Sequence, residues 1–308
     1  MLQATRPPLP PMPALLLAVL SVQGGAAFAK GLFAQLGPVG ATGLRIGLAA
    51  VFLALIFRPR WLALTTAQWR VLLSYGLVLG AMNLLYYLSL ARIPLGLAVT
   101  LEFVGPLVLA TVTSRQKLDL LWVALAASGI VLITPWSGES LDTLGMVLAL
   151  LAGACWAVYV VLGGRVSQVL PTSVGVAAGM LVAALAVLPV VLLTHAWTGL
   201  TPQLLGAGAL LAILSSAVPF TLELVALRAL PARTFSVLLS LEPAVAALFG
   251  WALLHETLLP SQWVAVALVV LASAGGAWTM RPAPTAPAEP PADMPPTLTP
   301  AVPRPESA

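Results

Sequence analysis

Two isolated glutamates lie inside long apolar stretches of this chain, and each belongs to a segment that occurs twice. Residues 94–106 form the first copy and contain Glu102, residues 231–243 form the second copy and contain Glu242, and both copies begin and end with proline. A carboxylate surrounded by hydrocarbon is energetically costly, so one that is found there is expected to bind a cation or to carry a proton. The matched copies predict a duplicated membrane protein whose working site lies between its halves.

The composition is that of a membrane protein. Of the 308 residues, 60% are hydrophobic and 8% are charged, whereas about a quarter of the residues in a soluble domain are charged. The net charge of +4 comes from residues that stand singly between apolar runs, so the basic surface of a nucleic-acid-binding protein is not indicated. The single cysteine, Cys155, excludes an internal disulfide and a cysteine-rich metal site.

Sequence signatures of the common catalytic sites are missing. His255 and Glu256 begin like the zinc-protease motif, but a second histidine does not follow at the required spacing. Neither the glycine-lysine pattern of a P-loop nor a nucleophile elbow occurs. We therefore expect no enzyme, no cofactor and no metal, and the expected partners are a small-molecule substrate and membrane lipid.

The elements that must position the two glutamates are apolar runs of about 20 residues, the length that crosses a bilayer. They predict an all-α integral membrane protein with ten transmembrane helices, arranged as two five-helix repeats over residues 13–136 and 143–280. Residues 1–12 precede the first helix, and the proline-rich residues 281–308 are expected to form a disordered tail. The predicted spans are 13–33, 39–57, 70–90, 94–114, 119–135, 143–163, 172–194, 203–227, 231–252 and 261–280.

The positions of arginine and lysine predict the orientation of these spans. If the N-terminus is cytoplasmic, every lysine and arginine in the loops or at the span ends, except Arg92, lies on the cytoplasmic side. Both termini are then cytoplasmic, and the second repeat is inverted relative to the first, an arrangement that supports alternating access to a midplane site. Further matches between the halves pair residues 25–29 with residues 153–157, and Asp119 with Glu256.

Ionisable residues within the spans are the candidates for binding a zwitterionic amino acid. Such a ligand needs a cation for its carboxylate and an acidic or carbonyl partner for its ammonium group. Glu102 and Glu242, both near the middle of a span, are candidates for the ammonium group or for a coupled proton. Lys30 and Arg45, in the outer third of the first two spans, are candidates for the carboxylate. Lys30 is favoured because the glycine pair at residues 24–25 permits close helix approach.

Each candidate also has a structural interpretation. The two cations could simply neutralise Glu102, and Glu223, near the cytoplasmic end of its span, could pair with Arg228. A glutamate that is neutral in one conformation and charged in another would instead link proton movement to the substrate step. Polar and aromatic side chains that share helix faces could line a cavity or serve in packing, namely Asn83 with Tyr86 and Tyr87, and Trp156 with Tyr159.

Several segments of this chain resemble the drug/metabolite transporter superfamily, specifically its ten-helix EamA-type permeases, and within that group the threonine/homoserine exporter type of bacterial inner membranes. The resemblance covers roughly residues 13–280, and the proline-rich tail departs from the family pattern. The segments that carry it are residues 21–30, 94–106, 153–157, 230–235 and 240–243.

The resemblance implies a secondary exporter of small amino acids, driven by an ion gradient that is usually of protons. An EamA-type exporter of another small metabolite or of a drug is the alternative. A membrane-embedded enzyme or scaffold would need a cluster of nucleophile and base residues or an extended soluble surface, and the sequence contains neither.

Overall fold

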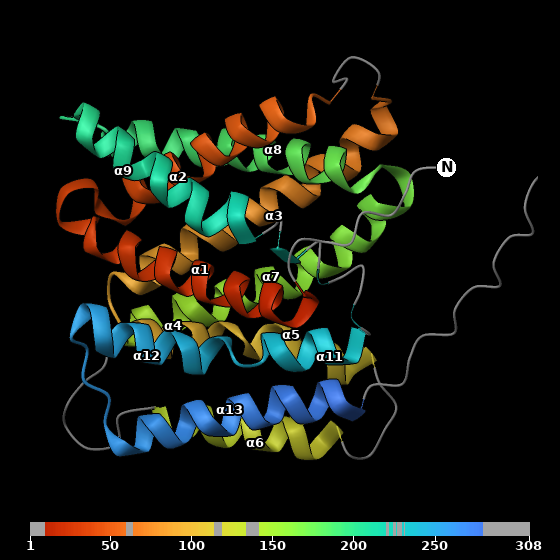
Figure 1. Ribbon diagram of the computed structural model, residues 1–308, viewed down its shortest axis with the longest axis vertical. Coiled ribbons are helices and arrows are strands. Elements are labelled where there is room, and N and C mark those ends of the chain that lie inside the picture. Colours follow the sequence, from red (N-terminus) through yellow and green to blue (C-terminus); the bar gives the residue numbers. More distant parts are fainter. Residues whose placement is uncertain are drawn as a thin grey trace, which may run out of the picture.

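The computed structural model describes residues 10–59, 64–113, 119–133, 142–219, 222–223, 226, 230 and 232–279. All regular secondary structure in these residues is helical (Figure 1). The helices are α1 (Pro11–Gly31), α2 (Phe33–Phe57), α3 (Thr66–Leu90), α4 (Leu95–Glu102), α5 (Val104–Thr113), α6 (Asp119–Ile133), α7 (Thr143–Val169), α8 (Thr172–Leu193), α9 (Pro202–Ala212), the π-helix η2 (Ile213–Ala217), α11 (Ala232–Leu239), α12 (Glu242–Leu254) and α13 (Pro260–Thr279).

The length and surface of these helices are those of a membrane protein. In the described residues, 7 helices are long and apolar enough to cross a bilayer, and shorter apolar stretches cover Leu95–Leu109, Leu121–Leu132 and Pro202–Ala217. Large apolar side chains point outward, for example Leu193, which is 80% exposed, and Trp278, which is 65% exposed. Such a surface is stable against lipid and unfavourable in water. The chain is therefore a helical membrane protein, as its composition predicts.

A helix occurs in each region predicted as a span, but the boundaries differ, most clearly between the first two spans. The second span was expected to start near residue 39, whereas α2 begins at Phe33, directly after α1. The chain bends instead at Gly37, whose φ of 62° lies in the left-handed region, just before Pro38. Glycine adopts this φ without a Cβ clash, and proline lacks the N–H that a regular helix would need. The turn therefore forms within the apolar run.

The two repeated segments are both interrupted at the same place, although each was predicted as a single span. The first breaks at Phe103, between α4 and α5, and the second breaks at residues 240–241, between α11 and α12. Pro106 and Pro243 follow at the same distance, and neither can donate a backbone hydrogen bond to the carbonyl four residues earlier. In the first copy that carbonyl belongs to Glu102. The repeated prolines thus place a helix break beside each glutamate.

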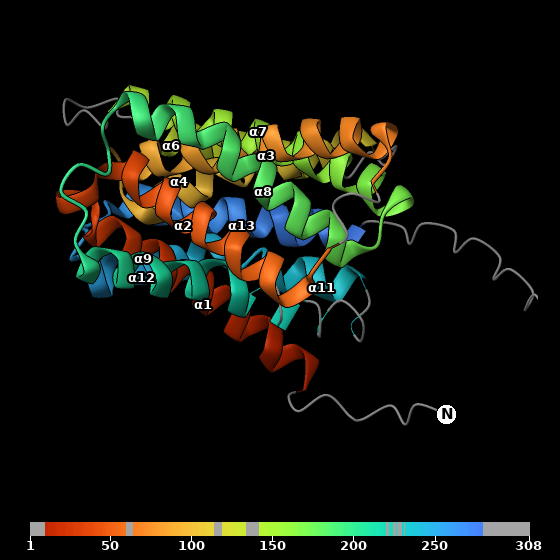
Figure 2. The ribbon, with the colours of Figure 1, turned by 90° about the horizontal axis from the view of Figure 1, so that it is seen from above.

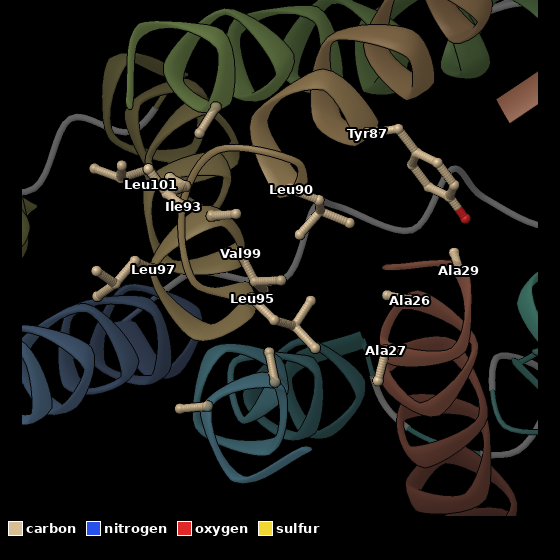
Figure 3. Packing of buried hydrophobic residues seen from close by; sticks show 14 of the residues in the cluster. Ala26, Ala27, Ala29, Tyr87, Leu90, Ile93, Leu95, Leu97, Val99 and Leu101 are labelled. Atoms are coloured by element: carbon tan, nitrogen blue, oxygen red, sulfur yellow. The ribbon is translucent and has the colours of Figure 1, made fainter. Parts of the chain in front are cut away.

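The two halves of the chain pack against each other along several helices. In Figures 1 and 2, α6 lies beside α13 at one side of the molecule, and α2 lies beside α8. α3 packs on both α7 and α8, while α4 packs on α12 and α7. The largest buried cluster joins α1, α3, α4, α12 and α13, and Figure 3 shows Tyr87 reaching from α3 toward Ala26 and Ala29 of α1. Glu102 and Glu242 both lie on helices that form this junction.

The break in the first copy is held by a glycine crossing. Gly153 of α7 lies against the backbone of Glu102, and a Cβ at this glycine would overlap the Glu102 carbonyl oxygen. Small residues allow membrane helices to approach closely where larger residues would separate them. The position of the Glu102 backbone therefore depends on residue 153 being glycine.

We expect Gly153→Ala to destabilise the fold, because its new methyl group must displace either α7 or the α4–α5 break. Overpacking of this kind costs ~1–3 kcal/mol, and it will lower the thermal unfolding midpoint of the purified protein in detergent. Gly164→Ala is the matched control, since Gly164 lies on the same helix with no neighbouring atom within 4 Å of an added Cβ. Equal midpoints for the two variants would contradict the close crossing.

Candidate functional site

Three acidic side chains from both halves of the chain approach one another inside the protein. Glu102 is the last residue of α4, Glu242 is the first residue of α12, and Glu223 lies in a short helical stretch after η2. Glu242 lies within electrostatic range of both Glu102 and Glu223. All three side chains are only partly buried. The two repeated glutamates thus lie within electrostatic range of each other.

The two repeated glutamates have different local partners. The Nε2 amide of Gln23 on α1 donates a hydrogen bond to Oε2 of Glu242 at 3.2 Å, and Gln23 is itself almost fully buried. Glu242 also opens a helix, where the helix dipole favours negative charge, whereas Glu102 closes one, where the dipole opposes it. In the described part of the chain, neither glutamate forms an ion pair with lysine or arginine.

Arg45 is the cation that acts on Glu102. Nη2 of Arg45 donates a hydrogen bond to Oδ1 of Asn83, and its guanidinium carbon lies 5.0 Å from the centroid of the Tyr87 ring. Asn83 is fixed in turn, because its Nδ2 donates to the carbonyl of Leu79 at 2.7 Å. The Arg45 guanidinium lies within electrostatic range of Glu102, and its buried Nε makes no hydrogen bond among the described residues. This guanidinium therefore keeps a donor for which the described protein supplies no acceptor.

Lys30 has a different carboxylate partner from the one expected. Its Nζ forms an ion pair with Oε1 of Glu256 at 2.6 Å and donates to the carbonyl of Ile93 at 2.7 Å. Lys30 therefore does not join Arg45 at the central acids, and the suggestion that it neutralises Glu102 is wrong. Glu256 was not among the candidate residues. The match between Glu256 and Asp119 of the other half is the feature of the sequence that could have marked Glu256 as a candidate.

The predicted aromatic and amide residues separate into distinct environments. Tyr86 lies within electrostatic range of both Glu102 and Glu242, so it belongs with the central acids. Its neighbour Tyr87 turns toward Arg45 instead, together with Asn83. Only part of the expected helix face therefore borders the acids.

The two aromatic residues of α7, Trp156 and Tyr159, pack against aromatic rings of neighbouring segments. Trp156 packs edge-on against Phe103 at the α4–α5 break, with ring centroids 4.9 Å apart. Tyr159 stacks on Tyr75 at the same centroid distance, and the Tyr75 hydroxyl donates to the Tyr159 hydroxyl at 3.0 Å. Tyr159 also lies within electrostatic range of Glu223. The suggested pairing of Glu223 with Arg228 lies outside the described residues.

Comparison with known proteins identifies the class of molecule to which this site belongs. Residues 143–275 match the family model described as the EamA-like transporter family. The chain is also 42% identical over 274 residues to the threonine/homoserine exporter RhtA of Escherichia coli (strain K12), covering 88% of this chain and 92% of that protein. The chain belongs to the EamA-like transporter family. It is a multi-pass membrane transporter and not an enzyme.

Other relatives agree with this assignment. The threonine/homoserine exporter RhtA of Salmonella typhimurium (strain LT2) is 42% identical over 274 residues, with coverage of 88% and 92%. The uncharacterized transporter YwfM of Bacillus subtilis (strain 168) is 27% identical over 243 residues, which is 75% of this chain and 81% of that protein. One crystal structure, 18% identical, has a TM-score of 0.56 over 85% of this chain and 96% of its own chain, and so shares the fold of this EamA-like transporter.

We expect dicyclohexylcarbodiimide to modify Glu102 but not Glu256. The reagent attacks protonated carboxyl groups in apolar surroundings, and a buried carboxyl group without a cationic partner is more stable when neutral. Glu256 is the internal control because its carboxylate forms an ion pair with Lys30. Mass spectrometry of peptides from the treated transporter will locate the adducts. An adduct on Glu256 with Glu102 unmodified would contradict the arrangement described here.

Proposed function

We propose that this transporter exports small hydroxy amino acids, such as threonine or homoserine, in exchange for protons by alternating access. The observation that carries the proposal is that Glu102, which lies within electrostatic range of the Arg45 guanidinium, also lies within electrostatic range of Glu242 from the other half. A site with both signs of charge suits a zwitterion, whose two ends need opposite partners. The identity of 42% to threonine/homoserine exporters over most of the chain supports the cargo.

The proposed architecture is ten membrane spans in two inverted five-helix repeats, covering residues 13–136 and 143–280. The long and short apolar helices together supply enough spans, and the equivalent helix breaks support the duplication. The distribution of arginine and lysine supports cytoplasmic positions for residues 1–12 and for the proline-rich residues 281–308, in a bacterial inner membrane.

Arg45 is the proposed partner of the substrate carboxylate, in place of Lys30. A guanidinium group presents parallel N–H donors that match the two oxygens of a carboxylate. Asn83 and the Tyr87 ring orient this group, while Lys30 is occupied by Glu256 and by the Ile93 carbonyl. Lys30 therefore lacks the freedom that a substrate-binding cation needs in this conformation.

Glu242 is the proposed partner of the substrate ammonium group, and Glu102 is the proposed proton carrier. The start of a helix stabilises the negative charge of Glu242, so this residue suits a lasting interaction with a cation. Glu102 lies at a helix end and gains less from the backbone. When charged, Glu102 adds to the attraction for the ammonium group. When it takes up a proton from the outside, that attraction falls and the amino acid is released, which gives antiport.

Glu102→Gln should uncouple transport from the proton gradient. In proteoliposomes, an imposed pH gradient will accelerate threonine movement by the parent protein, whereas the variant will exchange threonine at a rate that the gradient does not change. Asp142→Asn is the comparison, since Asp142 is an acid that pairs with Arg92 outside the central group. If Glu102→Gln responds to the gradient as the parent does, Glu102 is not the proton carrier.

Arg45→Gln should weaken substrate binding rather than coupling. Loss of one charge-assisted contact costs ~1.5–3 kcal/mol, so the KM for threonine should rise by roughly tenfold or more. Arg92→Gln, which removes an exposed arginine, should leave the KM unchanged. The assay includes homoserine, other amino acids and a cationic drug. Transport of the drug with no transport of threonine would replace the proposed cargo by the alternative one.

A further inference from the structure

The ion pair of Lys30 and Glu256 is the centre of a contact that joins the two halves at one end of the molecule. Lys30 belongs to α1, and Glu256 follows α12. While Oε1 of Glu256 binds Lys30, Oε2 accepts a hydrogen bond from the backbone N–H of Leu95 at 2.7 Å. Leu95 is the first residue of α4, so this carboxylate also caps the N-terminus of α4. The side chains of Lys30 and Glu256 are only 20% and 13% exposed.

The backbone conformation at the end of α12 places the Glu256 side chain near the N-terminus of α4. His255 ends α12 in the left-handed conformation, with a φ of 56°, and the N–H of Glu256 donates to the carbonyl of Gly250 at 3.0 Å. This turn folds the carboxylate back along α12. A Cβ on Gly250 would lie 2.5 Å from Oε2 of Glu256, so the carboxylate can lie there only because residue 250 is glycine. The turn and the glycine together hold Glu256 over the start of α4.

Tight packing beneath the ion pair closes this end of the molecule. Gly96 of α4 lies so near α12 that an added Cβ would be 2.6 Å from the Cα of Ala247. Figure 3 shows Leu95 pointing toward α12 and Ala26 and Ala27 facing the same region from α1. Leu95 and Ala247 are both almost completely buried. Helices α4 and α12 are therefore in close contact at this end, whereas α1 and the end of α12 border a pocket lined by Gly24, Ala27, Phe28, Gly31, Leu32, Leu253 and Leu254.

The opposite ends of the same spans are arranged differently. α5 continues α4, and α11 precedes α12, so a symmetric molecule would pack α5 on α11 as it packs α4 on α12. Instead, α5 packs on α7, α6 and α13, and α11 packs on α13 and α1. In the described part of the chain, α5 and α11 lack the close packing that joins α4 to α12. The close contact of α4 with α12 therefore has no counterpart between α5 and α11 in the described residues, although α5 and α11 each contact the other half.

We propose that Lys30, Glu256 and the first turn of α4 form the outer gate of this transporter. The proposal rests on the proposed function, because the predicted orientation places the end that carries Lys30 and Glu256 outside. Export requires the cargo to leave between the halves on that side. Opening must separate α4 from α12, break the ion pair and uncap α4, and water then solvates the parted charges. Glu256 is therefore a gating residue, distinct from Glu102 and Glu242, which act on the cargo and the proton.

A second ion pair at the same end provides a matched control. Arg92 and Asp142 also approach to 2.6 Å, but they are 42% and 35% exposed and link the end of α3 to the start of α7. The hydrogen bond from Arg92 lowers the pKa of Asp142, so this pair is charged at neutral pH. It does not lie between α4 and α12. Breaking it removes a salt bridge of the same kind without opening the gate.

The test measures access to a cysteine placed beneath the gate. Cys155→Ser removes the only native cysteine, and Ala246→Cys places one on the buried face of α12, beside the contact with α4. Intact cells are treated with a membrane-impermeant maleimide. Labelling should be slow with the gate intact and several-fold faster in Glu256→Gln and in Lys30→Met, which breaks the ion pair but keeps the cap on Leu95. Arg92→Gln should label as slowly as the parent.

Unchanged labelling in Lys30→Met and Glu256→Gln would overturn the proposal, and Lys30→Met decides alone if the other variant does not fold. Acceleration seen only in inside-out vesicles would also overturn it, since the gate would then face the cytoplasm. The readout needs no cargo. If the gate variants label faster from outside but the parent protein does not export threonine, the gate is supported and the proposed cargo is rejected.

Discussion

The cost of charge inside a lipid bilayer is the constraint on which this structure depends. Four ionisable residues within the spans, Lys30, Arg45, Glu102 and Glu242, occupy two kinds of environment. Lys30 has a carboxylate and a backbone carbonyl, and Arg45 has an amide and an aromatic face. Glu102 and Glu242 have no cation bound to them in the described residues. The paired groups hold helices together, while the unpaired acids are available for a cation or a proton.

Pro106 and Pro243 each follow a helix break, and these breaks place Glu102 and Glu242 at helix ends. A continuous helix would satisfy every carbonyl and would leave a glutamate as a side chain on an unbroken surface. Pro106 and Pro243 follow the interruptions of both copies at the same spacing, which supports the proposed duplication of the scaffold. The acids are not duplicated, because Glu102 precedes its break and Glu242 follows its own. The proposed duplicated scaffold therefore carries acids at non-equivalent positions, an asymmetry that suits the zwitterionic substrate proposed above.

Hydropathy and the positions of proline and glycine predict the helices of this membrane protein from the sequence. The apolar membrane helices follow from apolar run length, and the repeated segments that carry Glu102 and Glu242 follow from the matched prolines; both are local signals. The partner of Lys30 could not be deduced in the same way, because Glu256 lies in the other half of the chain and helix packing brings it to Lys30. Tyr86 and Tyr87 show the same limit, since adjacent residues on one helix face different neighbours.

A gate must be strong enough to close and weak enough for the transport cycle to open it. A partly exposed ion pair contributes ~0.2–1 kcal/mol, and a helix cap contributes ~0.5–2 kcal/mol. Inverting a two-state population from 1:99 to 99:1 takes about 5.5 kcal/mol. The contact of Glu256 with Lys30 and Leu95 therefore supplies only part of that difference. Neutralising one buried acid and binding one zwitterion change the electrostatic energy by amounts of the same order. A gate built from a single carboxylate is thus within reach of the events at Glu102 and Glu242, whereas an extensive ionic network would hold the halves closed.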